Sequence, residues 1–210
     1  KAGVLVADGA GVERAVDRPR WGACGTTGQR WKASSRLLVH RGVYDAFLEK
    51  LVSRVKTLRV GNGLDEKMEM GPCVSEKQRE TVAKYVDIGQ KEGAKLLCGG
   101  EKLTGGALGK GWFFAPTVFA DANAKMRVAC EEIFGPVTTV VPIGSLEEGI
   151  QVANSVPYGL SGSIYTRDVN KAFVAMRDFE TGLFYVNSST IGAEVHLPFG
   201  GIKDTGNGHR

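Results

Sequence analysis

Segments with the pattern of β-strands alternate with amphipathic helices along most of the chain, and this alternation restricts the fold most strongly. Residues 43–58 place apolar side chains three and four positions apart, with charged residues on the other face, as in a helix packed on one side. Residues 137–143, VTTVVPI, form a β-branched run typical of a strand covered on both faces. Because such strands and helices connect through right-handed crossovers, the sequence predicts one α/β domain, a mainly parallel sheet with helices on both faces.

Further helices are predicted where a residue able to cap a helix N-terminus precedes an amphipathic run. Ser75 with Gln78, Ser145 with Glu148, and Asp168 provide these starts. The predicted extended segments are 94–100 (a short buried strand), 111–119 (where Pro116 excludes a helix), 159–166, and 181–187 (the last strand). The glycine-rich segment 197–210 is predicted to be a loop.

Composition argues against several classes of protein. The 27 basic and 23 acidic residues give a net charge of +4, too small and too evenly spread for a nucleic-acid-binding surface. No stretch approaches the roughly 20 apolar residues of a membrane span, and the start of the chain lacks a signal-peptide pattern. We therefore predict an intracellular protein of the cytoplasm or the mitochondrion, with no nucleic-acid partner.

Cysteine and histidine positions predict no metal site. The four cysteines lie far apart without the spacing of zinc ligands, so we interpret them as reduced, packed thiols. They are Cys24, Cys73, Cys98 and Cys130. His40 and His196 have no carboxylate or serine at a spacing that suggests a catalytic triad, and we predict that both lie on the surface or in loops.

Three motifs occur in a fixed order: GTTGQRW at 25–31, EEIFGPV at 131–137 and PFGGIKDTGNGHR at 198–210. Gly135 and Pro136 in the second motif form a rigid turn that fixes the direction of the residues before it. Together the motifs resemble the catalytic half of the aldehyde dehydrogenase superfamily, and the resemblance covers essentially the whole chain. It implies one catalytic domain over 1–210, with the family's N-terminal dinucleotide-binding domain and C-terminal pairing strand absent from these residues.

The resemblance also assigns roles to two residues of the EEIFGPV motif. Glu132 matches the glutamate that binds the nicotinamide ribose hydroxyls, a diol to which a carboxylate can accept two charge-assisted hydrogen bonds. Phe134 matches the ring that packs near the nicotinamide. The phosphate site, the general-base glutamate and the oxyanion-holding asparagine of the family all lie outside the chain, so we expect both roles to be vestigial. No cofactor is then expected for this chain as given, and NAD(P) if the missing domain is supplied.

Trp31 stands where the resemblance places the catalytic cysteine, two residues after Gln29. An indole is neither a nucleophile nor titratable near neutral pH, so the covalent step has no agent there. Another cysteine is a poor substitute. Cys24 lies seven residues earlier, and the carboxylates beside Cys130 disfavour its thiolate. We expect the indole to fill the substrate funnel and bury apolar surface.

Three hypotheses follow from these observations. In the first, the chain is a catalytically inactive structural or accessory subunit derived from an aldehyde dehydrogenase, held in a homo-oligomer or larger assembly. In the second, it is part of an active NAD(P)-dependent enzyme that oxidises aldehydes to carboxylates through a thioester. In the third, it is a small-molecule binding module with an open pocket beside Trp31.

Overall fold

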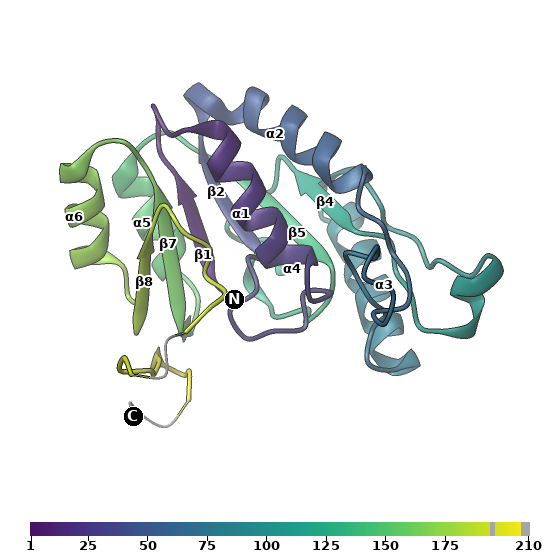
Figure 1. Cartoon of the computed structure of the whole chain (residues 1–210). Coiled ribbons are helices and arrows are strands. Elements are labelled where there is room, and N and C mark those ends of the chain that lie inside the picture. Colours follow the sequence, from purple (N-terminus) through teal and green to yellow (C-terminus); the bar gives the residue numbers. More distant parts are fainter. Residues whose placement is uncertain (194–195, 207–210) are drawn as a thin grey trace.

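The computed structural model describes residues 1–193 and 196–206 as an α/β domain built on a seven-stranded sheet (Figure 1). The strand order is β3-β4-β5-β2-β1-β7-β8, and every neighbouring pair is parallel except β3 with β4. The strands are β1 (Gly3–Val6), β2 (Arg36–His40), β3 (Lys95–Cys98), β4 (Thr117–Ala120), β5 (Val137–Ile143), β7 (Ser161–Tyr165) and β8 (Leu183–Val186). The predicted fold class is therefore confirmed.

Helices cover both faces of the sheet, as Figure 1 shows for α1 and α2 on one face and α5 on the other. The helices are α1 (Val12–Cys24), α2 (Arg41–Lys56), α3 (Glu76–Lys91), α4 (Arg127–Cys130), α5 (Leu146–Asn154) and α6 (Val169–Asp178), and residues Gly106–Lys110 form a 3-10 turn. A separate two-stranded ribbon pairs β6 (Tyr158–Gly159) with β9 (Ile202–Lys203). None of the helices within 1–193 and 196–206 is long and apolar enough to cross a membrane.

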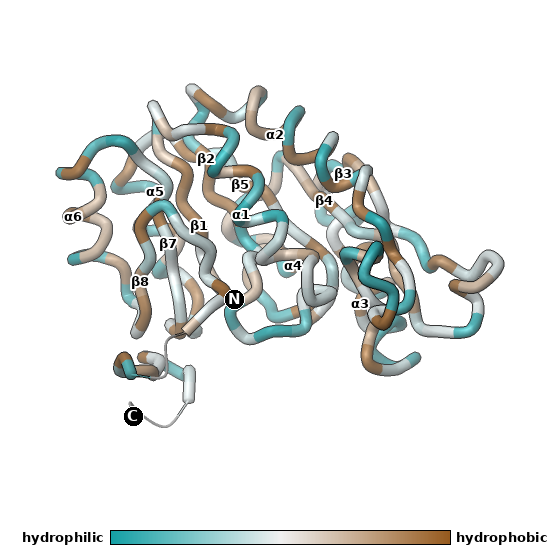
Figure 2. The backbone as a smooth tube through the Cα atoms, in the orientation of Figure 1, coloured by the Kyte–Doolittle hydropathy of each residue, from teal (hydrophilic) through white to brown (hydrophobic). Residues whose placement is uncertain are grey.

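Two apolar cores result from the alternation of side chains along the strands. In β2, Leu38 packs on the side of α3 to α6, whereas Leu37 and Val39 pack against α1 and α2. Phe47 of α2 and Phe119 of β4 are fully buried, one in each core. The hydrophobic colouring of the central strands in Figure 2 agrees with burial on both faces of the parallel sheet.

The predicted helix caps are present, but the side chain of Gln78 does not complete a reciprocal capping box with Ser75. The Ser75 hydroxyl accepts the backbone N–H of Gln78 at 3.2 Å, and the Ser145 hydroxyl accepts that of Glu148 at 3.1 Å. The side chain of Gln78 does not return to the cap residue, however, and instead reaches residues 133 and 134. Asp168 caps α6 through the N–H groups of residues 170 and 171, as predicted.

Some sequence predictions were wrong. β3 is a partly exposed edge strand, not a buried one, because it has a single neighbour in the sheet. The segment after β8 contains β9 in addition to loop, and residues 207–210 of the third motif lie outside the described residues.

His40 ends β2 and caps α2, since its Nδ1 accepts the N–H of Gly42 at 3.1 Å and its Nε2 lies 3.0 Å from the carbonyl oxygen of Gly144. His196 is exposed, as predicted.

Candidate functional site

The first two sequence motifs meet at one edge of the sheet because each precedes one of two neighbouring strands. The 25–31 loop leads toward β2 and the 131–136 turn leads into β5, and these strands are paired in parallel. Gly28 lies directly against Gly135: a Cβ on Gly28 would stand 1.9 Å from the Gly135 carbonyl oxygen. Gly28 also has a φ of +64°, a conformation that glycine adopts without strain. The contact fixes the two loops relative to each other.

Two glutamine side chains connect these loops to α3 and to the segment before it. The Gln29 Oε1 accepts the N–H of Val74 at 2.8 Å, and its Nε2 donates to the carbonyl of Pro72 at 3.3 Å. Gln78 Nε2 donates to the carbonyls of Ile133 and Phe134 at 2.8 and 2.9 Å. These bonds hold Phe134 at a φ of +57°, which is uncommon for a bulky residue. The glutamine of the first motif is thus a structural bridge between loops.

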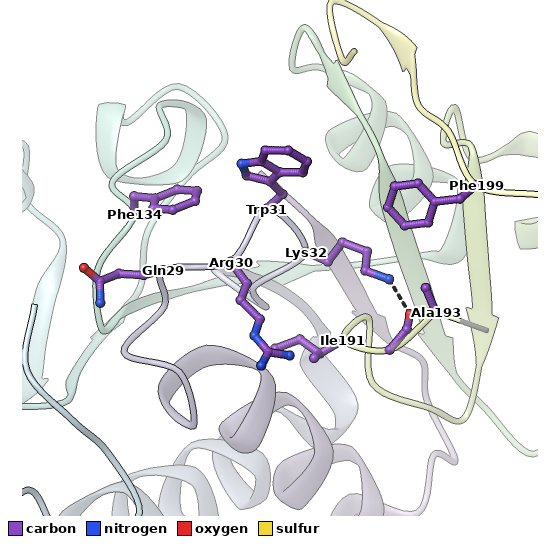
Figure 3. A pocket seen from close by; sticks show the side chains of 9 residues that line it. Gln29, Arg30, Trp31, Lys32, Phe134, Ile191, Ala193 and Phe199 are labelled. Carbon is purple, nitrogen blue, oxygen red and sulfur yellow. Dashed lines mark hydrogen bonds between the residues drawn. The ribbon is translucent and has the colours of Figure 1, made fainter. Parts of the chain in front are cut away.

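A pocket of about 480 Å³ opens between the two loops and the segment that follows β8 (Figure 3). It is lined by Gln29, Arg30, Trp31, Lys32, Phe134, Ile191, Gly192, Ala193 and Phe199. Figure 3 shows Trp31 between Phe134 on one side and Phe199 on the other. Trp31 is 70% exposed, so the expectation of a buried indole filling a funnel is wrong for this chain.

The predicted site residues separate into two groups. Trp31 and Phe134 line the same pocket, whereas Glu132 is absent from the lining, and its carboxylate lies 3.9 Å from the amino nitrogen of Lys1. The side chain of Glu132 is 41% exposed. Glu132 and Phe134, which the resemblance assigns to a nicotinamide nucleoside, are close in sequence. Of the two, only the Phe134 ring contributes to the pocket wall.

Sequence reasoning missed the wall formed by residues 191–193 and Phe199. Thr190 connects this segment to the Trp31 loop: its hydroxyl donates to the carbonyl of Lys32 at 2.6 Å and lies 3.1 Å from the hydroxyl of Ser34. The Lys32 ammonium donates to the carbonyl of Gly192 and, at 3.3 Å, to the hydroxyl of Tyr185. Two features of the sequence could have indicated this part of the pocket, the position of Lys32 directly after Trp31 and the presence of Phe199 in the third motif.

No cysteine is among the lining residues that the structure describes. Burial raises the pKa of Cys24 to about 12 and that of Cys73 to about 11. The pKa of Cys98 is also raised, mainly by burial, and the Cys130 thiol donates to the carbonyl of Ala124 at 2.8 Å. Over 1–193 and 196–206, no group of three or more histidine, cysteine or acidic residues could hold a metal ion.

We expect Cys24 and Cys73 to resist iodoacetamide at pH 8 in the folded protein. At this pH a thiol with the pKa of Cys24, about 12, is thiolate in roughly one molecule in ten thousand, and the thiolate is the reactive form. Peptide mass spectrometry after a timed reaction, with and without urea, measures the protection. Because the folded-state pKa of Cys24 is raised, the stability from its burial is complete below pH 9 and is lost as the pH rises toward 12. Equal labelling in both conditions would contradict the prediction.

Comparison with known proteins defines the class to which this arrangement belongs. The model of the "Aldehyde dehydrogenase family" matches residues 1–210. The structure superposes on betaine aldehyde dehydrogenase from Staphylococcus aureus in complex with NAD+ with a TM-score of 0.96 at 36% identity, covering 99% of this chain and 41% of that chain. The chain therefore belongs to the aldehyde dehydrogenase family.

Curated relatives give the same result over part of their length. An alpha-ketoglutarate semialdehyde dehydrogenase of Haloferax volcanii is 47% identical over 199 residues, which are 95% of this chain and 41% of the relative. An alpha-ketoglutaric semialdehyde dehydrogenase of Bacillus subtilis is 39% identical, over 96% of this chain and 41% of the relative. The chain thus spans about two fifths of the length of the curated relatives that it matches.

Proposed function

We propose that residues 1–210 form the catalytic domain of an aldehyde dehydrogenase family protein that no longer performs thioester chemistry, and that serves as a structural or accessory subunit. The observation that supports the proposal is Trp31, an exposed indole in a pocket whose described lining contains no thiol. The sequence resemblance places the family nucleophile at this position. Covalent catalysis needs a group that can become a nucleophile, and an indole has none. The buried thiols have raised pKa values and line other parts of the fold.

The alternative is an active NAD(P)-dependent aldehyde dehydrogenase of which this chain is one part. The extent of the family match favours it, since the resemblance continues through the whole chain without a gap in the fold. It requires a nucleophile other than residue 31 or a cysteine at that position in the working protein. The open pocket beside Trp31 also supports the third candidate, a module that binds a small molecule without reaction.

The residues present fit the nicotinamide end of NAD(P) only in part. The Phe134 ring lines the pocket and the Glu132 carboxylate is partly exposed, but Glu132 is not among the lining residues. The two cations of the lining, Arg30 and Lys32, would also repel the positively charged nicotinamide ring of NAD+. We therefore propose that the cofactor-binding roles of Glu132 and Phe134 are vestigial in this chain. With Trp31 in place, the proposed role of this chain is structural or accessory, and its proposed partners are copies of itself or a larger assembly.

The test compares the complete polypeptide that contains this chain with its Trp31→Cys variant. NADH formation is followed by absorbance with alpha-ketoglutarate semialdehyde and betaine aldehyde, the aldehydes in the relatives' names. We expect the natural protein to form no NADH above the uncatalysed rate. The introduced thiol should react quickly with iodoacetamide at pH 8, because position 31 is 70% exposed.

Trp112→Cys is the matched control, since this tryptophan is also exposed, at 39%, and does not line the pocket. It should gain a reactive thiol without any gain in NADH formation. NADH formation by the natural protein would overturn the proposal and favour the active enzyme. A gain of NADH formation in Trp31→Cys alone would support it, as would a reactive but inactive thiol at position 31, which would indicate that further catalytic parts are lost.

A further inference from the structure

We propose that the pocket beside Trp31 binds small planar aromatic anions, such as aromatic carboxylates, without covalent reaction. The inference rests on the proposed function, because it assigns a ligand to a pocket that has lost its nucleophile. Three aromatic side chains, Trp31, Phe134 and Phe199, line the pocket together with two cations, Arg30 and Lys32. No acidic residue occurs among the described lining residues.

The aromatic walls provide the surface on which a planar ligand would stack. Trp31 is 70% exposed, so most of its indole is in contact with water in the free chain. Covering an aromatic face removes apolar surface from water, and stacked or tilted ring pairs add to that gain. Figure 3 shows Phe134 and Phe199 on opposite sides of the indole, so a flat ring placed beside Trp31 would meet a second aromatic wall. The volume of about 480 Å³ lies within the range of roughly 300–1,000 Å³ typical of small-molecule sites.

The Lys32 ammonium provides the charge selectivity. It lies 5.0 Å from the centroid of the Phe199 ring and 5.8 Å from that of Tyr185, so the cation is held against aromatic faces. An ammonium has three donors, and the described partners, Gly192 and Tyr185, account for two of them. Partial burial and the nearby Arg30 lower the pKa of Lys32, a cost of positive charge that an incoming anion would relieve.

The chemistry of the lining therefore selects the ligand class. A neutral aromatic molecule would gain the stacking and leave the two cations uncompensated. A carboxylate on the same ring would accept the third donor of Lys32 in a charge-assisted hydrogen bond, which is stronger than a neutral one. An aliphatic anion would gain the charge interaction and leave the exposed indole in water. A ligand that is both aromatic and anionic satisfies both features of the pocket.

The test uses two probes that differ in charge and have nearly the same shape, 2-naphthoate and 2-naphthamide. Their dissociation constants for the complete polypeptide are measured by isothermal titration calorimetry at low ionic strength, with NMR saturation transfer for weak binding. We expect naphthoate to bind about tenfold more tightly than naphthamide, the size of effect that one charge-assisted hydrogen bond supplies. Raising the salt concentration should reduce that preference.

Three variants assign the binding to the pocket. Lys32→Gln should reduce the affinity for naphthoate about tenfold and leave that for naphthamide unchanged. Trp31→Ala should weaken both probes by a similar factor, because it removes the stacking surface. Trp112→Ala is the control for unspecific stacking on an exposed indole, and should leave both affinities unchanged.

Equal affinities of the natural protein for the two probes would overturn the inference, as would a naphthoate affinity that Lys32→Gln leaves unchanged. Absence of saturable binding would overturn it as well. None of these results bears on catalysis, because the titration contains no aldehyde or cofactor. NADH formation by the natural protein remains the separate result that overturns the proposed function, so the two failures are distinguishable.

Discussion

Replacing Gly28 by alanine is expected to lower the free energy of unfolding by about 3–5 kcal/mol, from the sum of backbone strain and steric overlap. The new Cβ would stand 1.9 Å from the Gly135 carbonyl oxygen, a backbone atom that moves only with its whole turn. The φ of +64° adds the cost of a left-handed conformation in a residue with a Cβ. Such a loss is a large part of the total stability of an ordinary domain, roughly 5–15 kcal/mol. Urea unfolding of the complete polypeptide, followed by fluorescence, measures the loss.

Alanine substitutions at two other glycines separate the cost of backbone strain from the cost of steric overlap. Gly9 has a φ of +69°, and no atom lies within 4 Å of the place where its Cβ would stand, so Gly9→Ala should cost about 1–2 kcal/mol from strain alone. Gly63 has open space and no positive φ, so Gly63→Ala should change the stability by less than about 1 kcal/mol. If Gly28→Ala proved no more costly than Gly9→Ala, the contact between the two loops would not be as tight as the structure has it.

The sequence predicted those parts of the fold that depend on local patterns. The β-branched run of β5 and the caps at Ser75, Ser145 and Asp168 act within a few residues, and each occurs where it was predicted. The meeting of the first two motifs could also be anticipated, because loops that precede neighbouring parallel strands share an edge of the sheet.

The first helix was missed because it lacks the usual local signals. α1 begins after Gly11, whose position offers no side-chain cap, and Pro19 inside it has no N–H to donate to the preceding turn. Packing stabilises it instead, since Ala15 and Val16 are buried in the core shared with α2. β1 has four residues, GVLV, a length at which an apolar run does not distinguish strand from helix.

The third wall of the pocket could not be predicted for a different reason. It depends on contacts between residues more than 150 positions apart, such as Ser34 with Thr190. A motif identifies residues that share a function in a family. Lys32 and Phe199 instead meet in the pocket because Phe199, which follows β8 in the chain, lies against the loop that carries Lys32. The exposure of Trp31 is likewise a property of the folded chain. The same indole would be predicted to be buried from its hydrophobicity alone.

Replacing Arg36 by methionine is the second change for which we expect a large loss of stability, about 2–4 kcal/mol. Arg36 begins β2, is 1% exposed, and donates to the carbonyls of Val152 and Ala153 at 3.0 and 2.8 Å, where α5 ends. A cation at a helix C-terminus interacts favourably with the helix dipole. Methionine has a similar length and is apolar, so it fills the space but leaves a buried carbonyl without its charged donor.

The opposing effect is the cost of burying the guanidinium. Burial lowers the pKa of Arg36 to about 10, because loss of hydration destabilises the charged form, and methionine removes that penalty. We expect the lost hydrogen bonds to outweigh it, because Ala153 has no other described donor to its carbonyl, whereas Val152 also accepts from Ser155. Arg36→Lys, which keeps the charge with a shorter reach, should lose less than Arg36→Met in urea unfolding. A methionine variant as stable as the natural protein would mean that desolvation cancels the contacts, and that α5 ends without help from β2.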